Sequence, residues 1–165
     1  LINDIINKGE KCIVWSSFIE NIEYFNDKYR NRGSVKIHGR MNIEARVKSV
    51  DRFKHDPNVL ILFATPQSAK EGLTLTVANH VIFYDRGFSL DDYLQAQDRI
   101  HRISQKKKCY IYNLMIKGSI DEWIDILLKA KENAARLGQG DINIDEYRDS
   151  IDYSFGEIIS NILGG

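Results

Sequence analysis

Gln95, Arg99 and Arg102 are the residues whose types and spacing point most directly to chemistry. They lie in the stretch QAQDRIHRISQKKK, residues 95–108. If residues 90–103 form a helix, a rotation of 100° per residue brings both arginines within about 40° of Gln95, and the apolar residues lie opposite. Two planar guanidinium groups on one free face suit bidentate contact with a phosphate. The alternative is a solvated polar face, although such faces usually mix lysine with glutamate.

Five runs of apolar and aromatic residues predict the strands that would position this helix. They begin at Cys12, Val35, Val59, His80 and Cys109. Their nearly continuous apolar character is typical of parallel strands that are covered on both faces. These runs therefore predict a parallel sheet whose strands are buried.

Helical spacing of apolar residues alternates with these runs, over residues 19–29, 43–54 and 90–103. After the last strand, Ser119 and Glu122 form a capping-box pattern that predicts the start of a further helix. Alternation of this kind predicts an α/β fold with right-handed crossovers. Ligands of such sheets bind beyond the carboxyl ends of the strands, so the segments that follow the strands are where a site is expected.

Composition excludes several classes of protein. The chain has 165 residues, 43% of them hydrophobic, and 23 basic residues balance 23 acidic ones. Any nucleic-acid contact must therefore come from a local patch and not from a general basic field. Cys12 and Cys109 lie in apolar runs and form no metal set or disulfide framework, which favours a cytoplasmic protein. No apolar stretch is long enough for a membrane span, and no signal peptide is recognisable.

Residues 72–105, GLTLTVANHVIFYDRGFSLDDYLQAQDRIHRISQ, resemble the fifth and sixth motifs of the Swi/Snf-type helicase-like ATPases of superfamily two. The family pattern is Gly-Leu-Asn-Leu-Thr, an apolar strand that ends in Asp, a short turn, and Gln-Ala-x-x-Arg-x-His-Arg-x-Gly-Gln. Upstream, KCIVWSSFIENIEYF is similar to the fourth motif, and HGRMNIEARVKSVDRF is similar to the stretch that follows it. The resemblance covers residues 1–135.

Some residues depart from that pattern. The segment TPQSAKEG is one residue longer than the family form and lacks its glycine pair, and Thr74 replaces the usual Asn. The turn RGFSL replaces Trp-Asn-Pro, and Ser104 replaces a Gly. These departures leave the subfamily open.

The resemblance implies a C-terminal RecA-like lobe, which is a three-layer sandwich with a mainly parallel sheet between helices and a C-terminal helical extension. It also implies that ATP and Mg²⁺ are shared with an N-terminal lobe of the same protein. Arg99 and Arg102 would reach the phosphates, and Gln95 would hydrogen-bond in the same site. Gly72 and Glu71 would line the ATP cleft, although Gly72 is equally compatible with a helix C-cap.

Five residues at strand ends are candidate contacts to the backbone of double-stranded DNA: Ser17, His38, Arg40, Thr65 and Lys70. Hydroxyl, imidazole, guanidinium and ammonium donors bind phosphate oxygens without reading sequence. The alternative for each one is ordinary turn chemistry.

The phosphate loop G-x-x-x-x-G-K-[ST] is absent from the sequence, so we expect the chain alone to be inactive as an ATPase. The chain starts at Leu1 inside an amphipathic pattern, and we expect it to be a monomeric piece of a longer protein. Residues 1–137 are predicted as the lobe, and residues 138–165 as a linker and helical tail. Two other functions stay open: a stand-alone phosphate- or nucleotide-binding module, and a catalytically silent interaction domain.

Overall fold

The structure, a computed structural model, describes residues 1–69, 73–100 and 105–150. The chain divides into two compact units. The first comprises Leu1–Arg86 and Asp91–Leu114, and the second comprises Gly87–Leu90 and Met115–Gly165. Each unit is described by itself.

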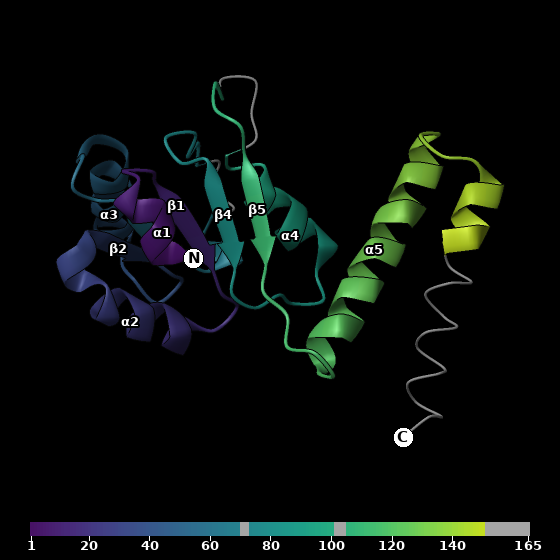
Figure 1. Cartoon of the computed structure of the whole chain (residues 1–165), viewed down its shortest axis with the longest axis horizontal. Coiled ribbons are helices and arrows are strands. Elements are labelled where there is room, and N and C mark those ends of the chain that lie inside the picture. Colours follow the sequence, from purple (N-terminus) through teal and green to yellow (C-terminus); the bar gives the residue numbers. More distant parts are fainter. Residues whose placement is uncertain (70–72, 101–104, 151–165) are drawn as a thin grey trace. The chain divides into compact units, whose positions relative to one another are not determined.

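The first unit contains a sheet of five parallel strands in the order β2-β3-β1-β4-β5 (Figure 1). The strands are β1 (Cys12–Trp15), β2 (Ser34–Ile37), β3 (Ile61–Ala64), β4 (His80–Phe83) and β5 (Tyr110–Asn113). These strands confirm the five predicted runs, and the parallel order confirms the RecA-like α/β fold class. The three central strands are buried along their whole length, as their continuous apolar sequences require.

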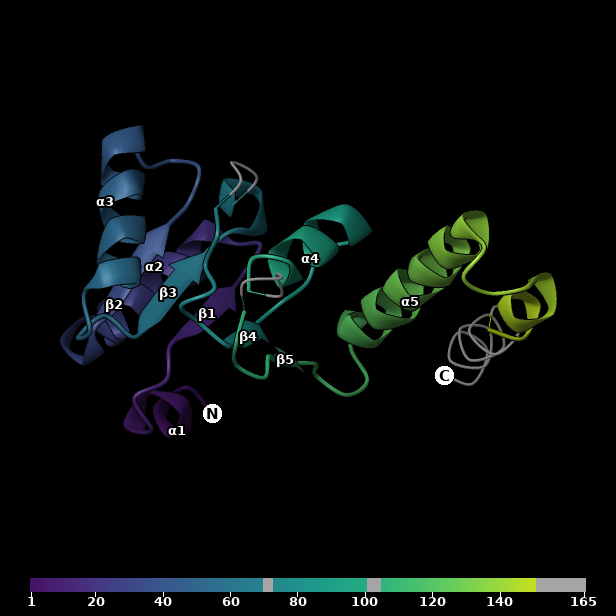
Figure 2. The ribbon, with the colours of Figure 1, turned by 90° about the horizontal axis from the view of Figure 1, so that it is seen from above.

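Helices cover both faces of this sheet. They are α1 (Ile2–Asn7), α2 (Ile19–Lys28), α3 (Ile43–His55) and α4 (Leu90–Gln97), with short 3₁₀ turns η1 (Arg30–Arg32) and η2 (Pro66–Ala69). Alternate strand residues separate the two core layers. Cys12 and Val14 pack with residues of α1 and α2, whereas Ile13 and Trp15 pack with residues of α3 and α4. Figure 2 shows α1 on one side of the strands and α3 and α4 on the other.

The strand register brings the strand ends level. Cys12 of β1 lies beside both Ile61 of β3 and His80 of β4, and Ser34 of β2 also pairs with Ile61. Because the strands begin level and have equal lengths, the turns that leave their carboxyl ends emerge along one edge. That edge is where the candidate residues were expected.

The predicted helix 90–103 is shorter than expected. Helix α4 ends at Gln97, and residues 98–100 form a turn. The turn is held from outside the helix, because the Leu75 N–H donates to the Arg99 carbonyl at 3.0 Å and Ile100 is fully buried. Tertiary contacts therefore override the helical periodicity of this stretch.

The second unit contains α5 (Ile120–Gln139). Ser119 is its N-cap, as predicted, and the Ser119 hydroxyl accepts from the Asp121 N–H at 3.2 Å. The helix ends at Gly140, whose φ of 80° is the left-handed conformation that favours glycine. Residues 138 and 139, predicted as linker, thus belong to the last turn of α5, and the domain boundary at residue 137 stays a prediction. None of the described helices is both long and apolar enough to cross a membrane.

Candidate functional site

A carboxylate from the end of β4 holds the turn between β1 and α2. Asp85 accepts a hydrogen bond from the Ser17 N–H at 2.7 Å, and its other oxygen accepts from the Ser16 hydroxyl. The Asn21 side-chain amide donates to Asp85 at 3.3 Å and to the Ser16 hydroxyl at 3.1 Å. Ser16 is fully buried, whereas Ser17 is exposed. The network therefore fixes the turn and leaves the Ser17 side chain accessible.

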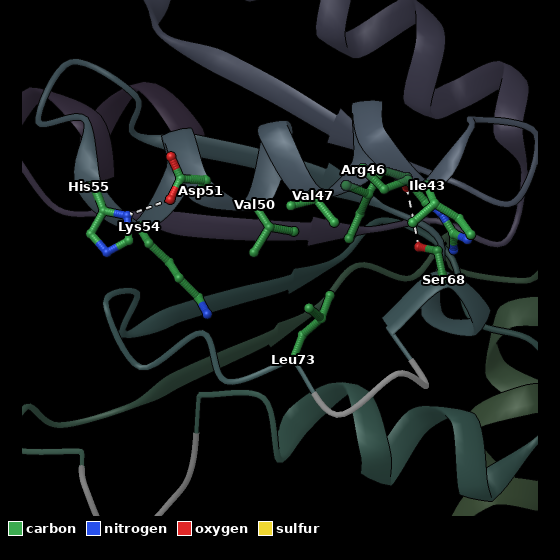
Figure 3. Close-up of a pocket in the computed structure, with 10 residues that line it drawn as sticks. Ile43, Arg46, Val47, Val50, Asp51, Lys54, His55, Ser68 and Leu73 are labelled. Carbon is green, nitrogen blue, oxygen red and sulfur yellow. Dashed lines mark hydrogen bonds and ion pairs between the residues drawn. The ribbon is translucent and has the colours of Figure 1, made fainter.

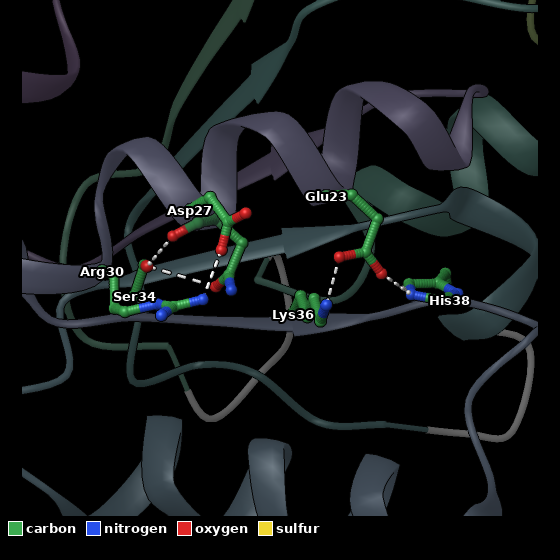
Figure 4. A network of polar contacts seen from close by, with 7 residues as sticks. Glu23, Asp27, Arg30, Ser34, Lys36 and His38 are labelled. Atoms are coloured by element: carbon green, nitrogen blue, oxygen red, sulfur yellow. Dashed lines mark hydrogen bonds and ion pairs between the residues drawn. The ribbon is translucent and has the colours of Figure 1, made fainter.

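His38 follows β2, but the structure places its ring inside a polar network (Figure 4). Its side chain is 6% exposed, and its Nε2 lies 2.7 Å from the Glu23 carboxylate. Lys36 donates to the other Glu23 oxygen. Hydrogen bonds, first from Lys36 and then from His38, lower the pKa of Glu23 from its ordinary value of 4.5, against the opposing effect of partial burial. His38 thus ties β2 to α2 and is not accessible to a DNA backbone in this conformation.

Arg40 and Thr65 differ in accessibility. The Arg40 side chain is 72% exposed, and its Nη1 lies 3.4 Å from the carboxylate of Glu20 in the first turn of α2. Thr65 is buried, and its N–H donates to the Ile37 carbonyl at 3.2 Å. The two exposed candidates are therefore both close to the start of α2: Ser17 precedes it in the sequence, and Arg40 contacts Glu20 in its first turn.

Arg99 is buried, with 7% of its surface exposed, so the expectation that it points outward with Gln95 is wrong. The physical reason is the early end of α4, which places Arg99 in a turn where the helical rotation no longer applies. Its Nη1 donates to the Leu73 carbonyl at 3.5 Å, and its own carbonyl accepts from the Leu75 N–H at 3.0 Å. Gln95 lies within α4 and is exposed, as expected.

Four of the predicted site residues lie outside the described residues: Lys70, Glu71, Gly72 and Arg102.

Gln105 was not singled out from the sequence, although it closes the same segment. Its side-chain amide donates to the carbonyls of Thr76 at 3.1 Å and Ala78 at 2.9 Å. These bonds join the end of the sixth-motif stretch to the segment before β4. A glutamine that follows a helical stretch carries no sequence signal for such a role, because its partners lie 29 and 27 residues away.

A pocket of about 250 Å³ lies between α3 and Leu73. Figure 3 shows Ile43, Val47 and Val50 along α3 and Leu73 across from them, with the ion pair of Asp51 and His55 at one end. The pocket is mainly apolar and contains none of the predicted phosphate or DNA contacts.

The described residues contain no group of three or more His, Cys, Asp or Glu side chains that could hold a metal ion. Cys12 is buried, and burial raises the pKa of its thiol to about 12, which makes it unreactive. The described site candidates of the first unit are thus hydrogen-bonding and cationic groups that follow the strands.

Comparisons with known proteins bear on the family to which the chain belongs. Residues 1–104 match the family described as the helicase conserved C-terminal domain. The ATP-dependent helicase ULS1 of Saccharomyces cerevisiae is 38% identical over 126 residues, which cover 74% of this chain and 8% of that protein. Protein CHROMATIN REMODELING 19 of Arabidopsis thaliana is 31% identical over 174 residues, which cover 100% of this chain and 22% of that protein. The chain thus spans less than a quarter of either relative.

Among solved structures, the crystal structure of the C-terminal part of the Fun30 ATPase domain superposes with a TM-score of 0.69 at 29% identity. The match covers 75% of this chain and 41% of that one. The family match covers the strands β1, β2, β3 and β4, and it includes the turn in which Arg99 lies. The chain therefore belongs to the helicase conserved C-terminal domain family, as a C-terminal lobe of the Swi/Snf helicase-like type.

Proposed function

We propose that this chain provides one side of an ATP site whose other side lies on an N-terminal RecA-like lobe, and that it contacts the backbone of duplex DNA. The whole protein would be an ATP-dependent DNA translocase. In this arrangement Arg99 and Arg102 neutralise charge on the transferring phosphoryl group, and Gln95 hydrogen-bonds beside them. Glu71 and Gly72 line the same cleft.

The observation that carries this proposal is the attachment of Arg99 to the segment after residue 72. Its side chain and its carbonyl both bond to that segment, at Leu73 and Leu75. Arg99 is thus joined to a segment whose residue Leu73 lies 26 positions earlier in the sequence. A guanidinium held in place before the reaction loses little free energy to reorganisation when charge develops on a phosphate.

The residues of this chain fit the part of an ATP site that supplies cationic groups, but not the parts that hold the phosphates and the metal ion. ATP would supply the phosphoanhydride bond whose hydrolysis drives movement. The sequence has no phosphate loop, and the described residues offer no carboxylate cluster for a divalent cation. We therefore assign the phosphate cradle and Mg²⁺ to the N-terminal lobe.

For DNA, the accessibility of Ser17 and Arg40 supports these two residues as phosphate contacts. His38 and Thr65 are buried. Their proposed role is to stabilise the turns after β2 and β3 and not to contact DNA themselves. Lys70 stays a candidate. With a formal net charge of zero, binding is expected to be weak, sensitive to salt and independent of base sequence.

A stand-alone phosphate-binding module is less well supported. In such a module the turn after β1 would offer free backbone N–H groups to the ligand. Here the Ser17 N–H donates to Asp85 and the Phe18 N–H donates to the Ser16 hydroxyl at 3.2 Å. Both backbone N–H groups therefore already have acceptors within the chain.

The test uses a two-lobe protein in which an N-terminal ATPase lobe precedes this chain, and it measures DNA-stimulated ATP turnover. Arg102→Ala and Arg99→Ala are expected to lower kcat by about 10³-fold with a smaller change in KM. Arg→Lys at either position should rescue poorly, because an ammonium lacks the planar fork. The matched control is Arg30→Ala, which removes an arginine that is 74% exposed on η1.

Melting curves accompany the kinetics, because Arg99 is buried and its loss is expected to destabilise the lobe. Turnover close to that of the parent in Arg102→Ala and in Arg99→Lys, with both variants folded, would refute the proposed role of the arginines.

A further inference from the structure

Asp85 and Arg86 are consecutive residues that reach elements on opposite faces of the sheet. Asp85 binds the turn that leads into α2. Arg86 is 9% exposed, and its guanidinium lies over the ring of Tyr93 in α4, 5.7 Å from the ring centre. One peptide bond therefore joins a contact with the α2 side to a contact with the α4 side.

Both ends of this link are held firmly. On the first side, the Asp85 carboxylate accepts from the Ser17 N–H, the Ser16 hydroxyl and the Asn21 amide. Hydrogen bonds to a charged acceptor are about twice as strong as neutral ones. A displacement of the turn would therefore move Asp85 with it.

On the second side, Tyr93 is fixed in its place. Its hydroxyl accepts from the Asn113 side-chain amide at 2.9 Å, and its ring packs against Phe83 with the ring centres 4.7 Å apart. Arg86 rests on this ring. Gln95, a proposed ATP-site residue, lies two positions after Tyr93 on the same helix.

We propose that Asp85 and Arg86 are positioning residues that couple the DNA-contacting turn at Ser17 to α4. This inference rests on the proposed function, because it requires Ser17 to meet a phosphate and α4 to serve the ATP site. When DNA contact at Ser17 displaces the turn, the Asp85 carboxylate moves with it and displaces the backbone at the end of β4. Arg86 then transmits this displacement to Tyr93 and so to α4.

The two residues should differ in their kinetic effects, which a purely structural role would not produce. In the two-lobe protein, ATP turnover is measured against the concentration of duplex DNA. Asp85→Asn should raise the DNA concentration for half-maximal stimulation about tenfold, equal to about 1.4 kcal/mol. The loosened turn at Ser17 weakens DNA binding by more than the loss of one negative charge strengthens it. Arg86→Gln should lower the ratio of stimulated to basal turnover about tenfold and leave that DNA concentration within about twofold of the parent value.

Asp27→Asn is the matched control, because it removes an exposed carboxylate of α2 that pairs with Arg30 at the other end of the helix. It should leave both quantities unchanged. If Asp85→Asn does not fold, Asn21→Ala replaces it, since Asn21 donates to both Asp85 and Ser16.

Two results would overturn the coupling. One is that Asp85→Asn and Arg86→Gln show the same DNA dependence and the same ratio of stimulated to basal turnover as the parent. The other is an equal fall of basal and stimulated turnover in Asp85→Asn and Arg86→Gln, which indicates general damage. Ser17→Ala separates this failure from failure of the DNA contact itself. An unchanged DNA dependence in Ser17→Ala refutes the contact, whereas a weakened one beside a normal Asp85→Asn refutes only the coupling.

Discussion

Replacing Gly33 by alanine should be far more destabilising than the same change at Gly9, although both glycines have nearly the same backbone conformation. Their φ values are 74° and 73°. A left-handed conformation costs an alanine about 1–2 kcal/mol. At Gly9 no atom lies within 4 Å of the added Cβ, so that strain is the whole expected cost.

At Gly33 the added Cβ would overlap the Asn58 carbonyl oxygen and lie 3.0 Å from the Asn58 carbonyl carbon. The backbone cannot retreat easily, because the Gly33 carbonyl accepts from the N–H groups of Leu60 at 2.8 Å and Ile61 at 3.1 Å. Relief of the overlap must therefore disturb the start of the β2–β3 pairing. We expect a total loss of about 4 kcal/mol or more, which belongs to the exceptional range for single substitutions.

The assay is urea unfolding of the chain and of both variants, followed by circular dichroism, with free energies from linear extrapolation. The difference between Gly33→Ala and Gly9→Ala isolates the steric overlap, since the backbone strain is common to both. Equal losses in the two variants would refute the close approach of Gly33 to Asn58, and with it the position of the edge strand β2, which precedes His38 and Arg40.

Two further predictions concern carboxylates of α2. In the two-lobe protein, Glu20→Gln should tighten duplex DNA binding about two- to threefold in fluorescence anisotropy at low salt, because Arg40 loses a competing carboxylate. Loss of Glu23 should alter the pH dependence of unfolding: the hydrogen bonds from Lys36 and His38 lower the Glu23 pKa below 4.5. Their stabilising effect is therefore present above pH of about 4.5 and is lost as the pH falls through the lowered pKa, so Glu23→Gln should flatten the acid side of a stability profile.

Matched variants decide both outcomes. Asp51→Asn removes an exposed carboxylate of α3 that pairs with His55, and it should leave DNA affinity unchanged; an equal gain in Asp51→Asn and Glu20→Gln would indicate a general charge effect. For the pH profile, an acid limb in Glu23→Gln as steep as in the parent would contradict the role assigned to Glu23.

The strands and their order of alternation with helices were predictable, because buried parallel strands need continuous apolar runs such as those at Cys12 and His80. The start of α5 was predictable from Ser119, since an N-cap is a local signal. The parallel register also brings the described candidates that follow the strands, Ser17, His38, Arg40 and Thr65, to one edge of the sheet. Which of them are accessible could not be predicted: Glu23, 15 residues from His38 in sequence, buries that ring in an ion-paired network.

The end of α4 and the burial of Arg99 lay beyond sequence reasoning. Residues 98–117 contain no glycine or proline, so nothing local signals a stop. The stop depends on the Leu75 N–H, which comes from a segment 24 positions before Arg99. Asp85 was visible in the sequence as the Asp that ends the apolar strand of the family pattern, but its bonds to the turn were not, because its partners lie 64 to 69 residues away. Long-range hydrogen bonds of this kind leave no periodicity to detect.

Calorimetric titration with ATP and Mg²⁺ decides whether the ATP site is divided between two lobes. The chain alone should release little heat and show no saturation at micromolar nucleotide, because it has no phosphate loop. The two-lobe protein should show a saturable site under the same conditions. A micromolar dissociation constant for the chain alone would contradict the divided site and would favour a stand-alone nucleotide-binding module.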